Sequence, residues 1–274
     1  MAFVETERED GIMIIRLNRP ERMNALGSEL RAALEKAWEE FQETDDLHVA
    51  ILTGTGRAFC AGGDLKEMVE QDGGELGPPQ SHMDDPYEQG RIHKPVIAAI
   101  NGFAFGGGFG LAELADLRIA STLATFEMSG AKRWLLGSYQ HGFVNGLPHA
   151  IATELAFSFR FTAERMYELG FLNRVTEPDD LMPTALEMAK HLLTLAPAAR
   201  VNTVVMMREM RPHVSVELEE LAARLHRHGS HEDLKESRRA FVEKRDPVFK
   251  GWNNPEDKFH TPTLERMRQE RNAR

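Results

Sequence analysis

The stretch 104-AFGGGFGLAELADLRIA-120 places bare backbone at the start of an amphipathic segment. Counting Gly102, five glycines fall within nine residues, and a single acid, Glu113, stands in the apolar part that follows. The glycines come directly after the strand-like run 94-KPVIAAING-102, and a second strand-like run, 48-HVAILTG-54, opens into TGRAFCAGGD in the same way. The sequence therefore predicts two strands that each end in a glycine turn next to a helix start.

Strand-like and helix-like segments alternate over the first two thirds of the chain. Residues 12–18 have the pattern of a strand, and residues 28–46 that of a helix with Ser28 as its cap. The acid-, Gly- and Pro-rich segment 71–90 has no periodicity and is predicted to be a surface loop. From about residue 200 the segments 201–210 and 215–245 are charged and helical, without strand signals. We therefore expect an α/β core over residues 1–200 and a helical domain over residues 201–274.

Composition excludes several classes of protein. The 274 residues are 42% hydrophobic and carry a formal net charge of -10, which argues against a nucleic-acid groove as the main surface. One cysteine, Cys60, rules out an internal disulfide framework or a cysteine-rich metal site, and suits a reducing cytoplasm. The first residues lack an apolar signal region, and no later run approaches a membrane span. We expect a cytoplasmic globular protein without a membrane or nucleic-acid partner.

The glycine turns do not fit the familiar nucleotide and hydrolase motifs. Counting six positions from Gly106, Gly107 or Gly108 gives leucine, alanine or glutamate, so G-x-G-x-x-G is absent. The chain also lacks a Walker A motif, a G-x-S-x-G elbow and H-E-x-x-H spacing for zinc. Two glycine turns beside helix starts can instead aim N–H groups at one oxygen. This arrangement is an oxyanion hole, and no metal site is expected.

Four motifs together resemble the enoyl-CoA hydratase/isomerase, or crotonase, superfamily. They are GTGRAFCAGGDLKEM (54–68), HKPVIAAINGFAFGGG (93–108), LPHAIATELAFSFRFTAERMYELGFLNRV (147–175) and AFVEKR (240–245). The resemblance implies a ClpP/crotonase-like spiral of ββα units followed by a helical trimerisation domain, in a homotrimer or a dimer of trimers. It also implies an acyl-CoA thioester substrate, with coenzyme A as part of the substrate and no separate cofactor.

Site residues follow from the resemblance position by position. Gly63 of AGGD and Gly107 of GGG would donate N–H groups to the thioester oxygen and stabilise an enolate. Ala61 would offer backbone contacts to adenine. The coenzyme A nucleotide would also meet Lys66, Phe241 and Lys244, with Arg22 as a weaker phosphate candidate.

The two glutamates that hydratases of this family use are missing. The first would fall on Gly110, and the second on Gly130 when the phenylalanine of ATFEMSGAKRWLLG is aligned; in a slipped register Glu127 would replace it. Glycine has nothing to titrate, so the remaining candidates for proton transfer are Glu113 and His141. The loss is also expected to empty volume beside the acyl group.

Three functions remain open from the sequence. The first is isomerisation or hydration/dehydration of a bulky or cyclic enoyl-CoA through an enolate held by the oxyanion hole. The second is a C–C bond hydrolase on the same fold, acting on a diketone by retro-Claisen cleavage with His141 and an acid. The third is an acyl-CoA-binding protein without catalysis.

Overall fold

The computed structural model describes residues 2–70 and 85–273, which form two compact units. Of the described residues, the first unit comprises 2–64, 85–127 and 160–211, and the second comprises 65–70, 128–159 and 212–273. The predicted boundary at residue 200 differs from this division: the helical segment that begins there belongs partly to the first unit. Residues 128–159 join the C-terminal helices in the second unit, which no local sequence pattern indicated.

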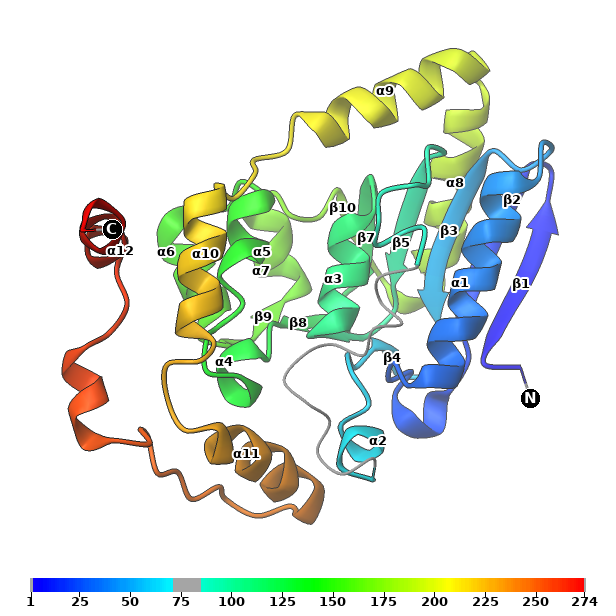
Figure 1. Cartoon of the computed structure of the whole chain (residues 1–274). Coiled ribbons are helices and arrows are strands. Elements are labelled where there is room, and N and C mark those ends of the chain that lie inside the picture. Colours follow the sequence, from blue (N-terminus) through cyan, green and yellow to red (C-terminus); the bar gives the residue numbers. More distant parts are fainter. Residues whose placement is uncertain (1, 71–84, 274) are drawn as a thin grey trace. The chain divides into compact units, whose positions relative to one another are not determined.

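A six-stranded sheet forms the centre of the first unit (Figure 1). Its strands, in spatial order, are β1 (Val4–Glu9), β2 (Ile12–Leu17), β3 (Val49–Gly54), β5 (Val96–Ile100), β7 (Leu117–Ser121) and β10 (Arg174–Thr176). β1 is antiparallel to β2, and every other neighbouring pair is parallel. The three predicted strands are β2, β3 and β5, whereas the mostly exposed edge strand β1 lacks an apolar pattern and was missed.

A second sheet has four strands, and the first three of them alternate along the chain with strands of the six-stranded sheet. Its order is β4 (Ala58–Cys60), β6 (Phe103–Phe105), β8 (Thr125–Glu127) and β9 (Phe161–Thr162). The successive pairs β3–β4, β5–β6 and β7–β8 each send one strand to each sheet, and each pair is followed by a helix: α2 (Leu65–Glu70), α3 (Gly107–Leu114) and α4 (Gly130–Arg133). The chain therefore repeats a ββα unit, as the crotonase resemblance implied.

Helices cover both faces of the six-stranded sheet (Figure 1). On one face lies α1 (Ser28–Glu43), which buries a stripe at helical spacing: Leu30, Leu34, Ala37, Trp38 and Phe41. On the other face α8 (Leu181–Leu193) packs Ala185 and Ala189 against β2, β3 and β5. Burial on both sides explains why β3 and β5 are mostly apolar instead of alternating between apolar and polar residues. Helix α1 begins at Ser28 with Gly27 as its N-cap, so the cap prediction for Ser28 was wrong by one residue.

The first unit also contains the helices α7 (Ala163–Glu168) and α9 (Pro197–Glu209). Met206 and Met207, in the last turn of α9, and Met210, directly after it, are exposed.

The second unit is helical in its described part. In addition to α2 and α4 it contains α5 (Tyr139–Val144), α6 (His149–Ala156), α10 (Val216–Leu225), α11 (His231–Glu243) and α12 (Leu264–Asn272). Within this unit α5 packs on α6, α10 on α12, and α11 on both α2 and α4. The long helical segment predicted over 215–245 is broken at Gly229, whose φ of 147° is a conformation that favours glycine. None of the helices in the described ranges is long and apolar enough to cross a membrane.

Candidate functional site

The two glycine turns lie against each other in the first unit. A Cβ added to Gly62 would lie 3.1 Å from the backbone nitrogen of Gly107, and one added to Gly107 would lie 3.9 Å from the nitrogen of Gly63. The structure thus brings together two N–H groups that are 44 residues apart in sequence (107 − 63). The two turns are therefore close, and the convergence of their N–H groups on one substrate oxygen stays a prediction.

Glycine is required at two points of these turns. Gly106, the N-cap of α3, has φ 51° and ψ -118°, which side chains rarely tolerate, and its N–H donates to the carbonyl of Glu127 at 2.8 Å. A Cβ on Gly108 would lie 2.0 Å from the carbonyl oxygen of Cys60, so this glycine allows α3 to approach β4. The GGG run therefore sets both the start of α3 and its distance from the first turn.

The N–H groups of Gly63 and Gly107 take no part in the backbone hydrogen bonds of the described turns and loops. Leu26 forms a parallel bridge with Gly63, but the bridge uses the carbonyl of Gly62 (2.7 Å) and the N–H of Asp64 (3.4 Å). Gly107 is the first residue of α3, so its N–H has no acceptor within the helix. In residues 2–70 and 85–273, neither N–H donates to a backbone carbonyl in a turn or loop.

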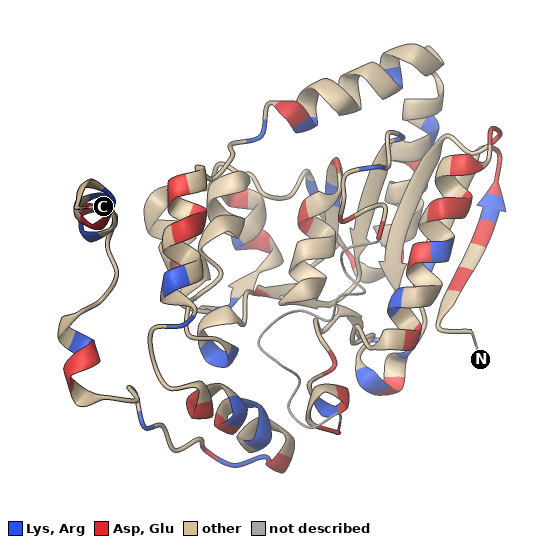
Figure 2. Ribbon diagram, viewed as in Figure 1, with Lys and Arg blue, Asp and Glu red and all other residues tan. Residues whose placement is uncertain are grey.

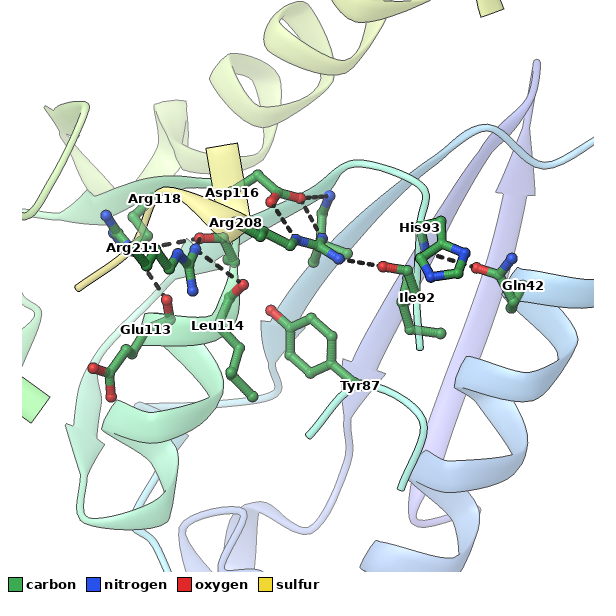
Figure 3. A network of polar contacts seen from close by, with 12 residues as sticks. Gln42, Tyr87, Ile92, His93, Glu113, Leu114, Asp116, Arg118, Arg208 and Arg211 are labelled. Carbon is green, nitrogen blue, oxygen red and sulfur yellow. Dashed lines mark hydrogen bonds and ion pairs between the residues drawn. The ribbon is translucent and has the colours of Figure 1, made fainter. Parts of the chain in front are cut away.

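Three arginines and a tyrosine hold the other end of α3 (Figure 3). The Tyr87 hydroxyl donates to the carbonyl of Leu111 at 3.2 Å. Arg118 donates from Nη1 to the carbonyls of Glu113 and Ala115, at 3.1 and 3.3 Å, and Arg211 also donates to Ala115, at 3.2 Å. The last carbonyls of a helix lack partners within it, so these donors stabilise the C-terminal end of α3.

Arg208 secures this end of α3 to the sheet through Asp116. Its Nε and Nη2 donate to the two carboxylate oxygens of Asp116 at 2.8 and 2.7 Å, and its Nη1 donates to the carbonyl of Ile92. Asp116 also accepts from the backbone N–H of Val96 on β5 at 2.8 Å. Burial, and next the charge of Arg211, lower the pKa of Arg118 to about 10, as expected for cations that share a desolvated site.

Glu113 lies one helical turn beyond Gly110, in the last turn of α3, and is buried. Its charge raises the pKa of Arg118, so the two groups interact electrostatically, although Figure 3 shows the Glu113 carboxylate directed away from Arg118 and Arg211. A Cβ on Gly110 would meet no atom within 4 Å, so the position of the absent first glutamate is open. At Gly130 the expected empty volume is not found, because a Cβ there would lie 2.2 Å from Oγ of Ser138.

Glu127 is a buried carboxylate next to the Gly106 turn. Its Oε2 accepts from Nε and Nη2 of Arg160 at 3.3 and 3.2 Å, and the Arg160 guanidinium lies over the ring of Phe105, 4.8 Å from its centroid. The sequence did not indicate Arg160, because this pairing spans 33 residues and no local motif marks it.

Arg22, predicted as a weak phosphate ligand, lies near Asp64 instead. Arg22 Nη1 is 3.8 Å from one oxygen of Asp64, and Arg19 Nη1 donates to the other oxygen at 2.7 Å. Asp64 is buried, so the two cations compensate its charge in the protein interior. Arg19 was not singled out from the sequence, although it stands beside Pro20 in the turn that carries Arg22.

Ala61 and Cys60 lie in the first glycine turn. The N–H of Ala61 donates to the carbonyl of Met23 at 3.0 Å, which leaves the carbonyl of Ala61 for the predicted adenine contact. Burial raises the pKa of the Cys60 thiol to about 12, so this cysteine is neutral and inert at physiological pH.

The remaining predicted residues lie in the second unit. His141 is half-buried on α5, and its backbone carbonyl accepts from the side chain of Asn145 at 2.7 Å. Lys66 on α2 and Phe241 on α11 belong to helices that pack against each other, and exposed Lys244 ends α11 in the left-handed conformation. The guanidinium of Arg133 lies over the Phe241 ring, 4.7 Å from its centroid. Of the predicted nucleotide contacts, Lys66, Phe241 and Lys244 thus belong to the second unit, whereas Ala61 and Arg22 belong to the first.

Comparison with known proteins identifies the class. The profile of the enoyl-CoA hydratase/isomerase family matches residues 7–253. Mevalonyl-coenzyme A hydratase of Aspergillus fumigatus is 34% identical over 253 residues, which cover 87% of this chain and 91% of that protein. The 1,2-epoxyphenylacetyl-CoA isomerase of Escherichia coli is 31% identical over 271 residues, covering 92% and 99%.

Comparison with solved structures supports the same family. The crystal structure of carnitinyl-CoA hydratase from Mycobacterium avium matches with a TM-score of 0.76 and 29% identity, over 91% of this chain and 99% of that one. The chain belongs to the enoyl-CoA hydratase/isomerase family and has the crotonase fold. Its relatives are named hydratases and isomerases of different CoA substrates, so the family establishes an enzyme and leaves its particular reaction open.

Proposed function

We propose that the protein converts an acyl-CoA thioester by stabilising its enolate between the N–H groups of Gly63 and Gly107. The observation that carries this proposal is the approach of the two glycine turns, with both N–H groups outside the regular backbone hydrogen bonds. Gly107 also begins α3, where the aligned peptide dipoles favour negative charge. Donors fixed before the reaction stabilise developing charge without reorganisation.

Glu113 is the first candidate for the proton carrier. It is a buried acid on the same helix as Gly107, one turn beyond the open position at Gly110. Glu127 is held by Arg160, and its position favours a structural ion pair. His141 is the second candidate, since an imidazole titrates near neutral pH.

The open space beside Gly110 favours a bulky or cyclic acyl group. A glutamate side chain there would occupy the volume that such a group needs. We therefore propose isomerisation or hydration/dehydration of a bulky or cyclic enoyl-CoA, with the nucleotide held by Lys66, Phe241, Lys244 and Ala61. Coenzyme A enters as part of the substrate, and no separate cofactor is needed. We also propose that the protein is cytoplasmic and assembles as a homotrimer or a dimer of trimers.

The test combines binding with turnover. Calorimetry with a panel of acyl-CoAs measures affinity, and absorbance with mass spectrometry follows crotonyl-CoA and a cyclic enoyl-CoA. Glu113→Gln and His141→Ala are measured alongside: the variant that keeps acyl-CoA affinity and loses turnover identifies the proton carrier. Retained turnover in both variants would contradict the assignment of either residue.

Two outcomes would replace the proposed function. Micromolar binding without turnover of any thioester would favour a non-catalytic acyl-CoA-binding protein. Absence of acyl-CoA binding would exclude the thioester chemistry and favour cleavage of a diketone by a C–C hydrolase.

A further inference from the structure

Arg160 forms an ion pair with a carboxylate that is buried within the second sheet. Elsewhere in the first unit, charged residues stand out on α1 and on the edge strand β1, and β3 and β5 carry none (Figure 2). Glu127 instead ends β8, an inner strand of the second sheet, and 6% of its side chain is exposed. A carboxylate in such a place needs a partner, and Nε and Nη2 of Arg160 donate two hydrogen bonds to its Oε2.

The strand register aligns Arg160 with the second glycine turn. In the parallel pair β6–β8, Glu127 is opposite Phe105. In the antiparallel pair β8–β9, Phe126 is opposite Phe161, so Arg160, directly before β9, comes next to Glu127. Side chains that are opposite each other on neighbouring strands share one face of the sheet. Phe105, Glu127 and Arg160 therefore form a row across three strands, in which the guanidinium binds the carboxylate and lies over the Phe105 ring.

This row ends at the turn that begins α3. Phe105 directly precedes Gly106, whose N–H donates to the backbone carbonyl of Glu127 at 2.8 Å. Gly107, the next residue, begins α3 and carries the second proposed oxyanion donor. A glycine run has little stiffness of its own, so the position of its N–H groups depends on the residues that hold the turn. Arg160 contacts both of them, Glu127 through its carboxylate and Phe105 through its ring.

We propose that Arg160 is a positioning residue for the oxyanion hole and acts through Glu127 and Phe105. The inference rests on the proposed function, because it concerns the N–H of Gly107. Arg160 keeps the start of α3 in one place before the substrate arrives, so that this donor needs no reorganisation when charge develops on the thioester oxygen. An arginine suits this role, since the edge of its guanidinium donates to the carboxylate while its face covers the ring.

Hydrogen exchange tests the positioning without any substrate. Mass spectrometry follows the amides of residues 103–110 and, as a report of global unfolding, those of β5. In Arg160→Met, we expect exchange over 103–110 to become about 10-fold faster, whereas β5 changes less. Arg174→Met is the matched control, because Arg174 on β10 forms an exposed ion pair with Glu187 and should leave both regions as in the wild type.

Steady-state kinetics tests the consequence for catalysis. Arg160→Met is expected to lower kcat by about 10-fold with KM nearly unchanged, because a displaced donor costs transition-state stabilisation and leaves the substrate contacts in place. Arg160→Lys keeps the charge and should recover part of kcat; it serves also if the methionine variant does not fold. Glu127→Gln keeps the shape of the side chain and should lower kcat without removing a limb of the pH profile.

Three results would overturn the proposal. They are wild-type exchange over 103–110 in both Arg160 variants, an equal rise in exchange over 103–110 and β5, and an unchanged kcat. Loss of one limb of the pH profile in Glu127→Gln would also overturn it, since that result would make Glu127 a proton carrier. Absence of turnover in the wild type contradicts the proposed function instead, and the exchange measurement then decides whether Arg160 holds the glycine turn.

Discussion

The end of α3 in the first unit and the α4–α11 region in the second both contain clustered arginines, but they differ in how those arginines are paired. Around α3, Arg118, Arg208 and Arg211 donate to helix carbonyls or to Asp116. Between α4 and α11, Arg238 stacks on Trp134 and keeps its buried Nε and Nη2 without a hydrogen bond in the described chain. Arginines that form hydrogen bonds hold an element in place, whereas a buried guanidinium edge without a hydrogen bond leaves the desolvation of its charge uncompensated.

The largest effect is expected at the N-terminal end of α3. The arginines described above hold the C-terminal end of this helix. Gly107→Pro removes the backbone N–H, while proline is well tolerated at the first position of a helix. We expect kcat/KM to fall by about 10²- to 10³-fold, the usual result of losing one oxyanion donor. Gly107→Ala is the matched control: its Cβ meets the flexible end of Leu26 at 2.9 Å, but it retains the N–H. Equal losses in the two variants would show that crowding, and not the donor, matters.

The second-largest effect is expected for Arg208, which forms hydrogen bonds with Asp116, in contrast to Arg238. Arg208→Met leaves the carboxylate of Asp116 with the N–H of Val96 as its remaining described donor. Because this ion pair is mostly buried, we expect the free energy of unfolding to fall by about 2–3 kcal/mol in chemical denaturation. Arg208→Lys, which keeps the charge without the fork, should lose part of this amount. A stability equal to that of the wild type would mean that the cluster does not hold α3.

The pH dependence of the free energy of unfolding tests the burial of the Cys60 thiol in the first unit. Burial raises its pKa from 9.0 to about 12, so the folded state retains the thiol proton over a pH range in which the unfolded chain releases it. The contribution of Cys60 to stability is therefore complete below about pH 9 and is lost as the pH rises toward 12. We expect the wild type to lose about 1 kcal/mol relative to Cys60→Ala between pH 9 and pH 10, measured by denaturant unfolding. Parallel pH profiles for the two proteins would contradict the burial of this thiol.

The smallest effect is expected for Arg238→Met. Removing a buried charge that has no partner abolishes a desolvation cost, so the free energy of unfolding should stay the same or rise by about 1 kcal/mol in the ligand-free protein. The measurement is the same denaturant titration as for Arg208→Met, with Arg239→Met as the exposed control. A loss as large as that of Arg208→Met would show that Arg238 has a structural role and would remove the contrast between the two regions.

Local patterns in the sequence determined much of the first unit. Largely apolar runs identified β2, β3 and β5, because strands buried on both faces need little polar surface. The glycine runs identified the turns at Gly63 and Gly107, since close backbone approach and positive φ leave glycine as the residue that fits. The motifs also identified the family, and the comparisons confirmed it.

Only the tertiary structure decided the pairing of side chains that are distant in sequence. It placed Asp116 on Arg208 and Glu127 on Arg160, directed Arg22 toward Asp64, and filled the space beside Gly130 with Ser138. It also left Arg238 buried against Trp134 without a hydrogen bond along its side-on edge in the described chain. These pairings depend on packing between elements that are far apart along the chain, which local periodicity does not encode, whereas backbone conformation depends on neighbouring residues and can therefore be read from short motifs.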